Sequence, residues 1–333
     1  MPAPLPAWWA ALEARAAQPP DRPRLPLCIE GRASPVGSIE AALTQRLSGA
    51  GLPLVQCERH AEVTGPPDAA FAQIAQWLAA QKLGGTWRDE LLPVTDEAGV
   101  ICSAIERAAV RPLGIATFAV HLIAWTESGS AWVQQRALDK ATDPGQWDTL
   151  VGGLVAARES VATALARETL EEAGLRLGAL QALRRAERIT IRRPVVQGFM
   201  VEHIDVFEAV VPEGITPVNQ DGEVARFDCI APAALIERLV ADAFTLEAAL
   251  MLARSLRRRG VVECRRQYPS PPPSPADAGE GVIRPPLPHQ RERVGVRVCV
   301  GSLSRRELTA SLNNSGCSVT FGAAASATAA CTK

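Results

Sequence analysis

The stretch that decides the fold is Gly153–Leu175, which reads GLVAARESVATALARETLEEAGL. Its segment 160–173 has good helix formers and neither Pro nor Gly, which predicts a helix. Ser160 is a suitable N-cap, and Gly174 stands where a left-handed C-cap residue belongs. The sequence therefore predicts a loop followed by a single capped helix.

Three glutamates, Glu168, Glu171 and Glu172, share one face of this helix because their spacing is i, i+3 and i+4. Without a cation their repulsion raises at least one pKa and weakens the helix. Mg²⁺ or Mn²⁺ removes that repulsion and also bridges phosphate oxygens. Arg167 precedes them and can hold a carboxylate by two hydrogen bonds. The alternative is an exposed acidic helix with ordinary ion pairs.

The stretch resembles the Nudix box, G-x5-E-x7-R-E-U-x-E-E-x-G-U, in which U is a bulky aliphatic residue. The complete spacing favours metal chemistry over a solvated helix face. One position departs from the pattern, because Thr169 has the shape of valine but not its polarity. The matching positions are Gly153, Glu159, Arg167, Glu168, Glu171, Glu172, Gly174 and Leu175.

The resemblance implies a Nudix fold, which is an α-β-α sandwich with a mixed sheet. In that fold the box forms a loop, a helix and a second loop. The resemblance further implies that Glu168 and Glu172 are the principal ligands of Mg²⁺ or Mn²⁺. Glu171 would be a further ligand, and the Gly153 carbonyl would complete the shell.

Supporting roles follow from the same resemblance. Arg167 would orient the glutamates, and Glu159 would brace the loop. Glu223 lies in an Asp-Gly-Glu-Val turn of the kind that supplies a late acidic residue to this site. A solvated turn carboxylate is the alternative for Glu223. Either Glu171 or Glu223 would take the proton from water.

Residues ahead of the box are candidates for contacts with the substrate. Arg136 and Lys140 could contact a phosphate, with a solvated loop as the alternative for each. Trp125, Trp132 or Trp147 could stack on a heteroaromatic ring, with core packing as the alternative for each.

Segments around the box narrow the resemblance. They are WVQQRALDKATDPGQWDTLVGG, VQGFMVEHIDVFEAVVP and NQDGEVARF. These segments resemble the Nudix hydrolases related to the Nudix half of fungal thiamine pyrophosphokinases, over about residues 10–262. That resemblance implies hydrolysis of thiamine diphosphate, or of its oxidised analogues, to the monophosphate plus phosphate.

Other functions remain open, because the box binds the diphosphate and the metal while the rest of the pocket selects the substrate. One alternative is a Nudix pyrophosphatase for ADP-ribose, a dinucleotide or coenzyme A. A nucleotide-sensing binding module is the non-enzyme alternative. An isopentenyl-diphosphate isomerase is disfavoured, because the sequence lacks the contexts of its catalytic Cys and Glu.

Three regions are predicted along the chain. Residues 1–112 would form an N-terminal α+β domain of the thiamine pyrophosphokinase-related Nudix family, and residues 113–262 would form the Nudix domain. Residues 263–333 are of low complexity and are expected to be disordered, with an accidental extension of the reading frame as the alternative. In the first region we expect no cluster of His, Cys or carboxylate residues that suggests chemistry, and His60 is interpreted as a surface residue rather than a ligand.

Hydrophobic periodicity and turn signals predict the elements. Their alternation predicts a mixed sheet between helical layers. Helices are expected at 8–17, 38–48, 71–81, 232–239 and 246–259. Strands are expected at 91–95, 100–105, 115–126, 131–137, 150–154, 184–191 and 195–208, the last two on either side of Pro194.

Composition narrows the class of protein. A net charge of −1 over 333 residues argues against a nucleic-acid surface. The eight cysteines form no C-x-x-C pair, which indicates neither a zinc site nor a disulfide framework, and reduced thiols in a cytoplasmic protein are expected. No signal peptide or membrane span is predicted. We expect a small-molecule diphosphate as partner, neither nucleic acid nor membrane, and a homodimer as an option.

Overall fold

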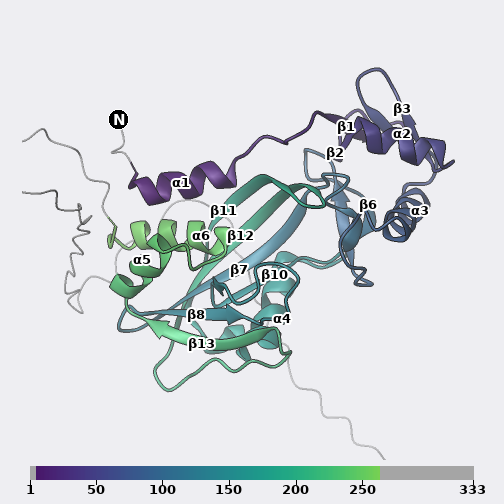
Figure 1. The fold of residues 1–333 in the computed structure, drawn as a ribbon. Helices are drawn as coiled ribbons and strands as arrows, with labels where there is room; N and C mark the ends of the chain where they lie inside the picture. Colours follow the sequence, from purple (N-terminus) through teal and green to yellow (C-terminus); the bar gives the residue numbers. More distant parts are fainter. Residues whose placement is uncertain (1–4, 263–333) are drawn as a thin grey trace, which may run out of the picture. The chain divides into compact units, whose positions relative to one another are not determined.

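The computed structural model describes residues 5–262 (Figure 1). The predicted tail, 263–333, lies outside the described residues. The helices are α1 (Ala7–Ala16), α2 (Ala41–Gly49), α3 (Pro67–Ala80), α4 (Val161–Ala173), α5 (Pro232–Val240) and α6 (Leu246–Arg258), with short 3-10 helices at Arg107–Ala109 and Leu177–Ala179. The strands are β1 (Arg24–Ile29), β2 (Gly37–Glu40), β3 (Leu54–Gln56), β4 (Ala61–Val63), β5 (Leu91–Thr95), β6 (Ile101–Glu106), β7 (Thr117–Thr126), β8 (Ala131–Arg136), β9 (Trp147–Asp148), β10 (Val151–Leu154), β11 (Gln181–Val195), β12 (Gly198–Val211) and β13 (Val224–Ile230).

A mixed sheet forms the centre of the second half of the chain. Its strand order is β11-β12-β7-β8-β13, with β10 paired to β7 and β9 paired to β8. Strands β12 and β7 are parallel, and the other pairs are antiparallel. The mixed sheet predicted from the alternating strands and helices is therefore confirmed.

Strand β7 shows why helices cover both faces of this sheet. Successive strand residues point to opposite faces. Val120, Leu122 and Ala124 belong to the hydrophobic cluster that includes residues of α4. Ala119 and Ile123 belong to a second cluster, which includes residues of α1, α5 and α6. The sheet thus lies between two helical layers, which confirms the expected α-β-α sandwich.

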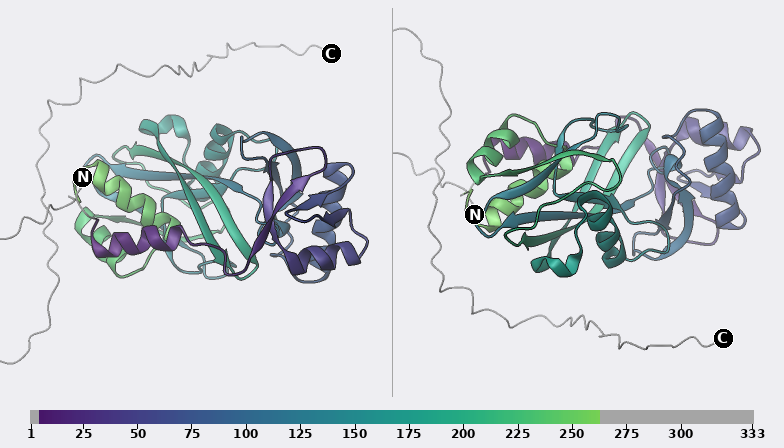
Figure 2. Two further views of the ribbon diagram at one scale, coloured as in Figure 1. Left: turned by 90° about the horizontal axis from the view of Figure 1, so that it is seen from above. Right: turned by 90° about the horizontal axis from the view of Figure 1, so that it is seen from below.

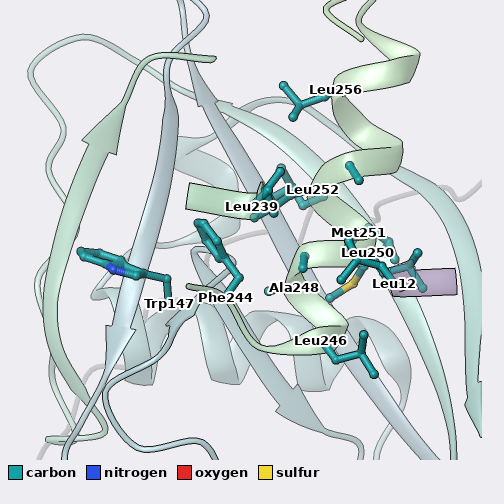
Figure 3. Close-up of a cluster of buried hydrophobic side chains, with 14 of the residues drawn as sticks. Leu12, Trp147, Leu239, Phe244, Leu246, Ala248, Leu250, Met251, Leu252 and Leu256 are labelled. Atoms are coloured by element: carbon teal, nitrogen blue, oxygen red, sulfur yellow. The ribbon is translucent and has the colours of Figure 1, made fainter. Parts of the chain in front are cut away.

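The layer opposite α4 combines helices from both ends of the described chain. Leu12 of α1 belongs to the same cluster as Met251 and Leu252 of α6, and Phe244 joins it from the preceding loop (Figure 3). Figures 1 and 2 show α1 beside α6. The first helix therefore contributes to the core of the central sheet, although it precedes the predicted boundary at 112.

Residues between α1 and the central sheet form a separate small sheet with the order β2-β1-β4-β3. Strands β1 and β4 are parallel, and β1–β2 and β3–β4 are antiparallel. Leu27 and Ile39 of this sheet are buried with Phe71 and Ile74 of α3 and with Leu92 of β5. The predicted hairpin follows as β5 and β6.

The predicted helix at 38–48 is wrong at its start. Its first residues belong to β2, and α2 begins at Ala41. The backbone N–H of Ser38 donates to the carbonyl of Leu113 at 2.9 Å, and Arg24 Nε donates to Ser38 Oγ at 2.9 Å. Tertiary partners therefore satisfy Ser38, which cannot act as the predicted helix cap.

Pro194 does not separate two strands, since β11 continues through it to Val195. Strand β11 lies at the edge of the sheet and has β12 as its one neighbouring strand within the described residues, so a missing N–H is tolerated there. The turn lies instead at Val196 and Gln197. Across residues 5–262, none of the helices has the combined length and apolar character that crossing a membrane requires.

Candidate active site

The helix of the box begins and ends as the sequence predicts. Ser160 Oγ accepts a hydrogen bond from the backbone N–H of Thr163 at 3.1 Å, and Gly174 ends the helix with a φ of 65°. Thr169, the departure from the box pattern, is fully buried. Its hydroxyl donates to the carbonyl of Leu165 at 2.6 Å, so the extra polar group is satisfied inside the helix.

Two glycines let β10 approach α4 and β7 closely. A Cβ atom at Gly153 would overlap the carboxylate of Glu168, and a Cβ atom at Gly152 would overlap the ring of His121. Any larger side chain would force these elements apart. Gly153, which opens the box, therefore places its backbone in close contact with the carboxylate of Glu168.

Arg167 joins the acidic residues of the box. Its Nε and Nη2 donate to the two oxygens of Glu159 at 2.9 Å each, and Nη2 also donates to the carbonyl of Leu154 at 3.1 Å. Its Nη1 donates to Glu168 at 2.7 Å and to Glu171 at 3.1 Å. The hydrogen bonds from Arg167 to Glu159 are the main cause that lowers the pKa of Glu159. The structure thus gathers three of the predicted carboxylates around one guanidinium.

Glu172 is buried on the inner side of this network, with 3% of its surface exposed. Its Oε2 accepts hydrogen bonds from the backbone N–H of Gly152 at 2.9 Å and from Gln134 Nε2 at 3.0 Å. Burial raises the pKa of Glu172 to about 8, and the nearby charges of Glu168 and Asp148 add to the rise. The site therefore makes an ionised Glu172 costly unless positive charge is added.

The residues present fit a divalent metal ion. Burial also raises the pKa of Glu168, despite the opposing effect of Arg167. Gln134 Oε1, beside Glu172, is buried and accepts no hydrogen bond. A hydrated Mg²⁺ or Mn²⁺ would supply both the missing charge and water molecules that donate hydrogen bonds. Glu171 is more exposed, with 47% of its side chain accessible, which suits an outer ligand or a base.

The later acidic residue lies near the box. Glu223 Oε2 forms an ion pair with Lys140 Nζ. Against the effect of burial, Lys140 lowers the pKa of Glu223, while the charge of Glu223 helps to raise the pKa of Glu168. Arg136 instead donates to Asp148 Oδ2 at 3.3 Å. The structure thus brings Glu223 and Lys140 together near Glu168 and turns Arg136 toward a different carboxylate.

The candidate tryptophans differ in exposure. Trp125 and Trp147 are buried in the cluster beneath α6, so core packing describes both (Figure 3 shows Trp147 near Phe244). Trp132 is partly buried and packs against the cluster of α4. Only Trp132 retains partial access to solvent.

A buried polar cluster of His121, Asp148 and Thr149, next to Gly152, was not predicted from the sequence. His121 Nδ1 lies 2.8 Å from Thr149 Oγ1 and 3.7 Å from Asp148 Oδ1. Burial lowers the pKa of His121, which favours the neutral ring. The sequence signal for this cluster is the single histidine inside the apolar run that forms β7.

Comparisons with known proteins agree with the box. A family model described as the NUDIX domain matches residues 116–250. Nudix hydrolase 24, chloroplastic, from Arabidopsis thaliana is 28% identical over 211 residues, which cover 58% of this chain and 54% of that protein. The isopentenyl-diphosphate Delta-isomerase of Streptomyces coelicolor is 32% identical over 166 residues, which cover 48% of this chain and 81% of that protein.

The chain contains a NUDIX domain at residues 116–250. It spans about half the length of the first curated relatives, 54% and 53% of two chloroplastic Nudix hydrolases from Arabidopsis thaliana. Among solved structures, the Nudix chain is similar to DR0079 from Deinococcus radiodurans, with 23% sequence identity and a TM-score of 0.40, covering 50% of this chain and 98% of that one. The Nudix domain expected from the box is confirmed, and the thiamine-related subfamily stays a prediction.

Proposed function

We propose that this Nudix protein is a metal-dependent hydrolase that cleaves the phosphoanhydride of a diphosphate substrate. The observation that carries the proposal is the folded box. Arg167 holds Glu159, Glu168 and Glu171, while Glu172 is buried beside the unpaired oxygen of a glutamine. Relatives named as Nudix hydrolases support the same activity.

Each box residue has a task in this proposal. Glu168 and Glu172 would hold Mg²⁺ or Mn²⁺, with Glu171 and the Gly153 carbonyl as further ligands. When bound, the ion neutralises the diphosphate and lowers the pKa of a water molecule. Arg167 fixes the glutamate side chains, so little reorganisation is needed when the substrate arrives.

Glu171 or Glu223 would accept the proton from the attacking water. The ion pair with Lys140 lowers the pKa of Glu223, which keeps its carboxylate ready to accept a proton. A substrate phosphate would compete with Glu223 for Lys140, so binding can release the carboxylate for the reaction. Arg136 is a weaker candidate for phosphate contact, because it already donates to Asp148.

The substrate that we propose first is thiamine diphosphate or an oxidised analogue, with the monophosphate and phosphate as products. The segments flanking the box support this choice by their resemblance to the thiamine-related subfamily. A pyrophosphatase acting on ADP-ribose, a dinucleotide or coenzyme A is the alternative within the family.

A panel of diphosphates tests the substrate. Phosphate release is measured with Mg²⁺ and with Mn²⁺ on thiamine and oxythiamine diphosphates, ADP-ribose, a dinucleotide and coenzyme A. Highest kcat/KM on the thiamine compounds supports the proposal, and highest kcat/KM on another member assigns the alternative. Isopentenyl diphosphate belongs in the panel because of the isomerase relative, and its conversion without phosphate release would contradict the hydrolase. Binding without turnover of any member would indicate a sensing module.

Variants test the roles of the carboxylates. Glu172→Gln is expected to remove nearly all turnover and to leave the fold intact, while the exposed Glu213→Gln serves as a matched control. Full turnover by the Glu172 variant would refute the assignment. Glu171→Gln and Glu223→Gln identify the base. The base is the residue whose replacement lowers kcat without changing the affinity for Mg²⁺.

A further inference from the structure

A second set of metal-binding side chains lies in the first region, outside the box. Strands β3 and β4 form a hairpin, and the backbone N–H of Cys57 donates to the carbonyl of His60 at 2.9 Å. Ligand atoms of Cys57, His60 and Glu62 all lie within 4.8 Å of one another, which no other group of three His, Cys or acidic residues achieves within residues 5–262. The prediction that this region has no such cluster is therefore wrong.

The strand register explains why the three side chains converge. Opposed residues of an antiparallel pair point to the same face, and so does every second residue along a strand. Cys57 stands opposite His60, and Val55 pairs with Glu62. Cys57, His60 and Glu62 therefore share one face of the hairpin, while Leu54, Ala61 and Val63 on the other face belong to the core.

The donor set selects the metal. A thiolate, an imidazole and a carboxylate are the three ligand types that Zn²⁺ takes in proteins, usually in tetrahedral geometry. Mg²⁺ prefers oxygen ligands alone and thus suits the box glutamates rather than this set. All three residues are partly buried, so an ion can enter from solvent and still be shielded.

We propose that Cys57, His60 and Glu62 bind a zinc ion that fastens the β3–β4 hairpin. Cys28 of β1 pairs with Glu62, but its sulfur is not part of the group within 4.8 Å, so water takes the fourth position. The ion cross-links the two sides of a hairpin whose strands have only three residues each. Its role is structural, and it does not depend on the proposed hydrolysis.

Cobalt tests the site because a thiolate bound to Co²⁺ gives a charge-transfer absorption that carboxylates alone cannot give. The full chain is freed of metal under reducing conditions and titrated with Co²⁺ in excess Mg²⁺, which occupies the box. We expect the absorption to saturate at one Co²⁺ per chain and to disappear when Zn²⁺ is added. Absence of the absorption in the unaltered protein would overturn the proposal.

Variants locate the site. Cys57→Ser is expected to abolish the absorption, and His60→Gln and Glu62→Gln are expected to weaken Co²⁺ binding by about tenfold or more. Cys229→Ser, at an exposed cysteine, and Glu172→Gln, in the box, should keep the absorption unchanged. An absorption that persists in Cys57→Ser places the thiolate elsewhere and overturns the proposal, as does unchanged affinity in the folded His60 variant.

Discussion

Replacing Glu172 by Gln is expected to stabilise the metal-free protein while removing its activity. Burial raises the pKa of Glu172 from 4.5 to about 8. At about 1.4 kcal/mol per pKa unit, that rise corresponds to about 5 kcal/mol of folding free energy. Because the folded-state pKa is the higher one, this contribution is fully present below pH 4.5 and is lost as the pH rises through about 8.

The variant should not show this loss. A glutamine does not titrate, and its amide oxygen can still accept the hydrogen bonds that Gly152 and Gln134 now donate to Glu172. In the presence of EDTA the two proteins should unfold at similar temperatures near about pH 5. Near about pH 9 the variant should unfold about 10 °C higher or more, since about 1 kcal/mol shifts the midpoint by about 2–4 °C in a chain of this size.

Thermal unfolding followed by circular dichroism measures the effect. Mg²⁺ at about a hundred times its Kd should raise the free energy of unfolding of the wild-type protein by about 2.7 kcal/mol and that of the variant by little. Glu171→Gln is the matched control, because that side chain is 47% exposed and should follow the wild-type pH profile. Parallel pH profiles for the wild type and Glu172→Gln in EDTA would refute the reasoning from burial.

Three further variants test the local structure. Gly153→Ala should abolish turnover while preserving the far-ultraviolet spectrum, because its methyl group overlaps the carboxylate of Glu168; normal kcat would contradict the close approach. Thr169→Val should change the free energy of unfolding by less than about 1 kcal/mol in urea titration, because only the hydrogen bond to Leu165 is lost; a larger loss would show that the hydroxyl is needed. Ser160→Ala should cost about 1 kcal/mol in the same assay through loss of the N-cap, and an unchanged midpoint would count against that cap.

Local chemistry made the box predictable. The caps of α4 and the shared face of its glutamates depend on residues close in sequence, so spacing alone was sufficient. The partners of the buried glutamate were not predictable in that way. Gln134 stands 38 residues before Glu172, and no pattern in a single sequence joins the two.

The errors in the first region have different causes. Strands β3 and β4 have three residues each, too short for a periodic signal. Cys57 and His60 meet because a tight turn closes between them, and a pattern of paired cysteines does not reveal such a mixed set. The start of α2 was misplaced because Ser38 is hydrogen-bonded by a distant segment.

The position of α1 bears on where the chain can be divided without disturbing its core. The backbone N–H of Gln18 donates to the carbonyl of Arg192, and Phe199 N–H donates to the carbonyl of Arg111. Both ends of the 18–112 segment therefore meet the same hairpin, β11–β12, while α1 stays with α6 in the layer of the central sheet. Such a segment has the form of an insertion between α1 and the central sheet. Removing residues 18–112 and joining the ends directly would keep Leu12 of α1 packed against α6. Removing everything before residue 113 would also remove α1 and leave α6 uncovered.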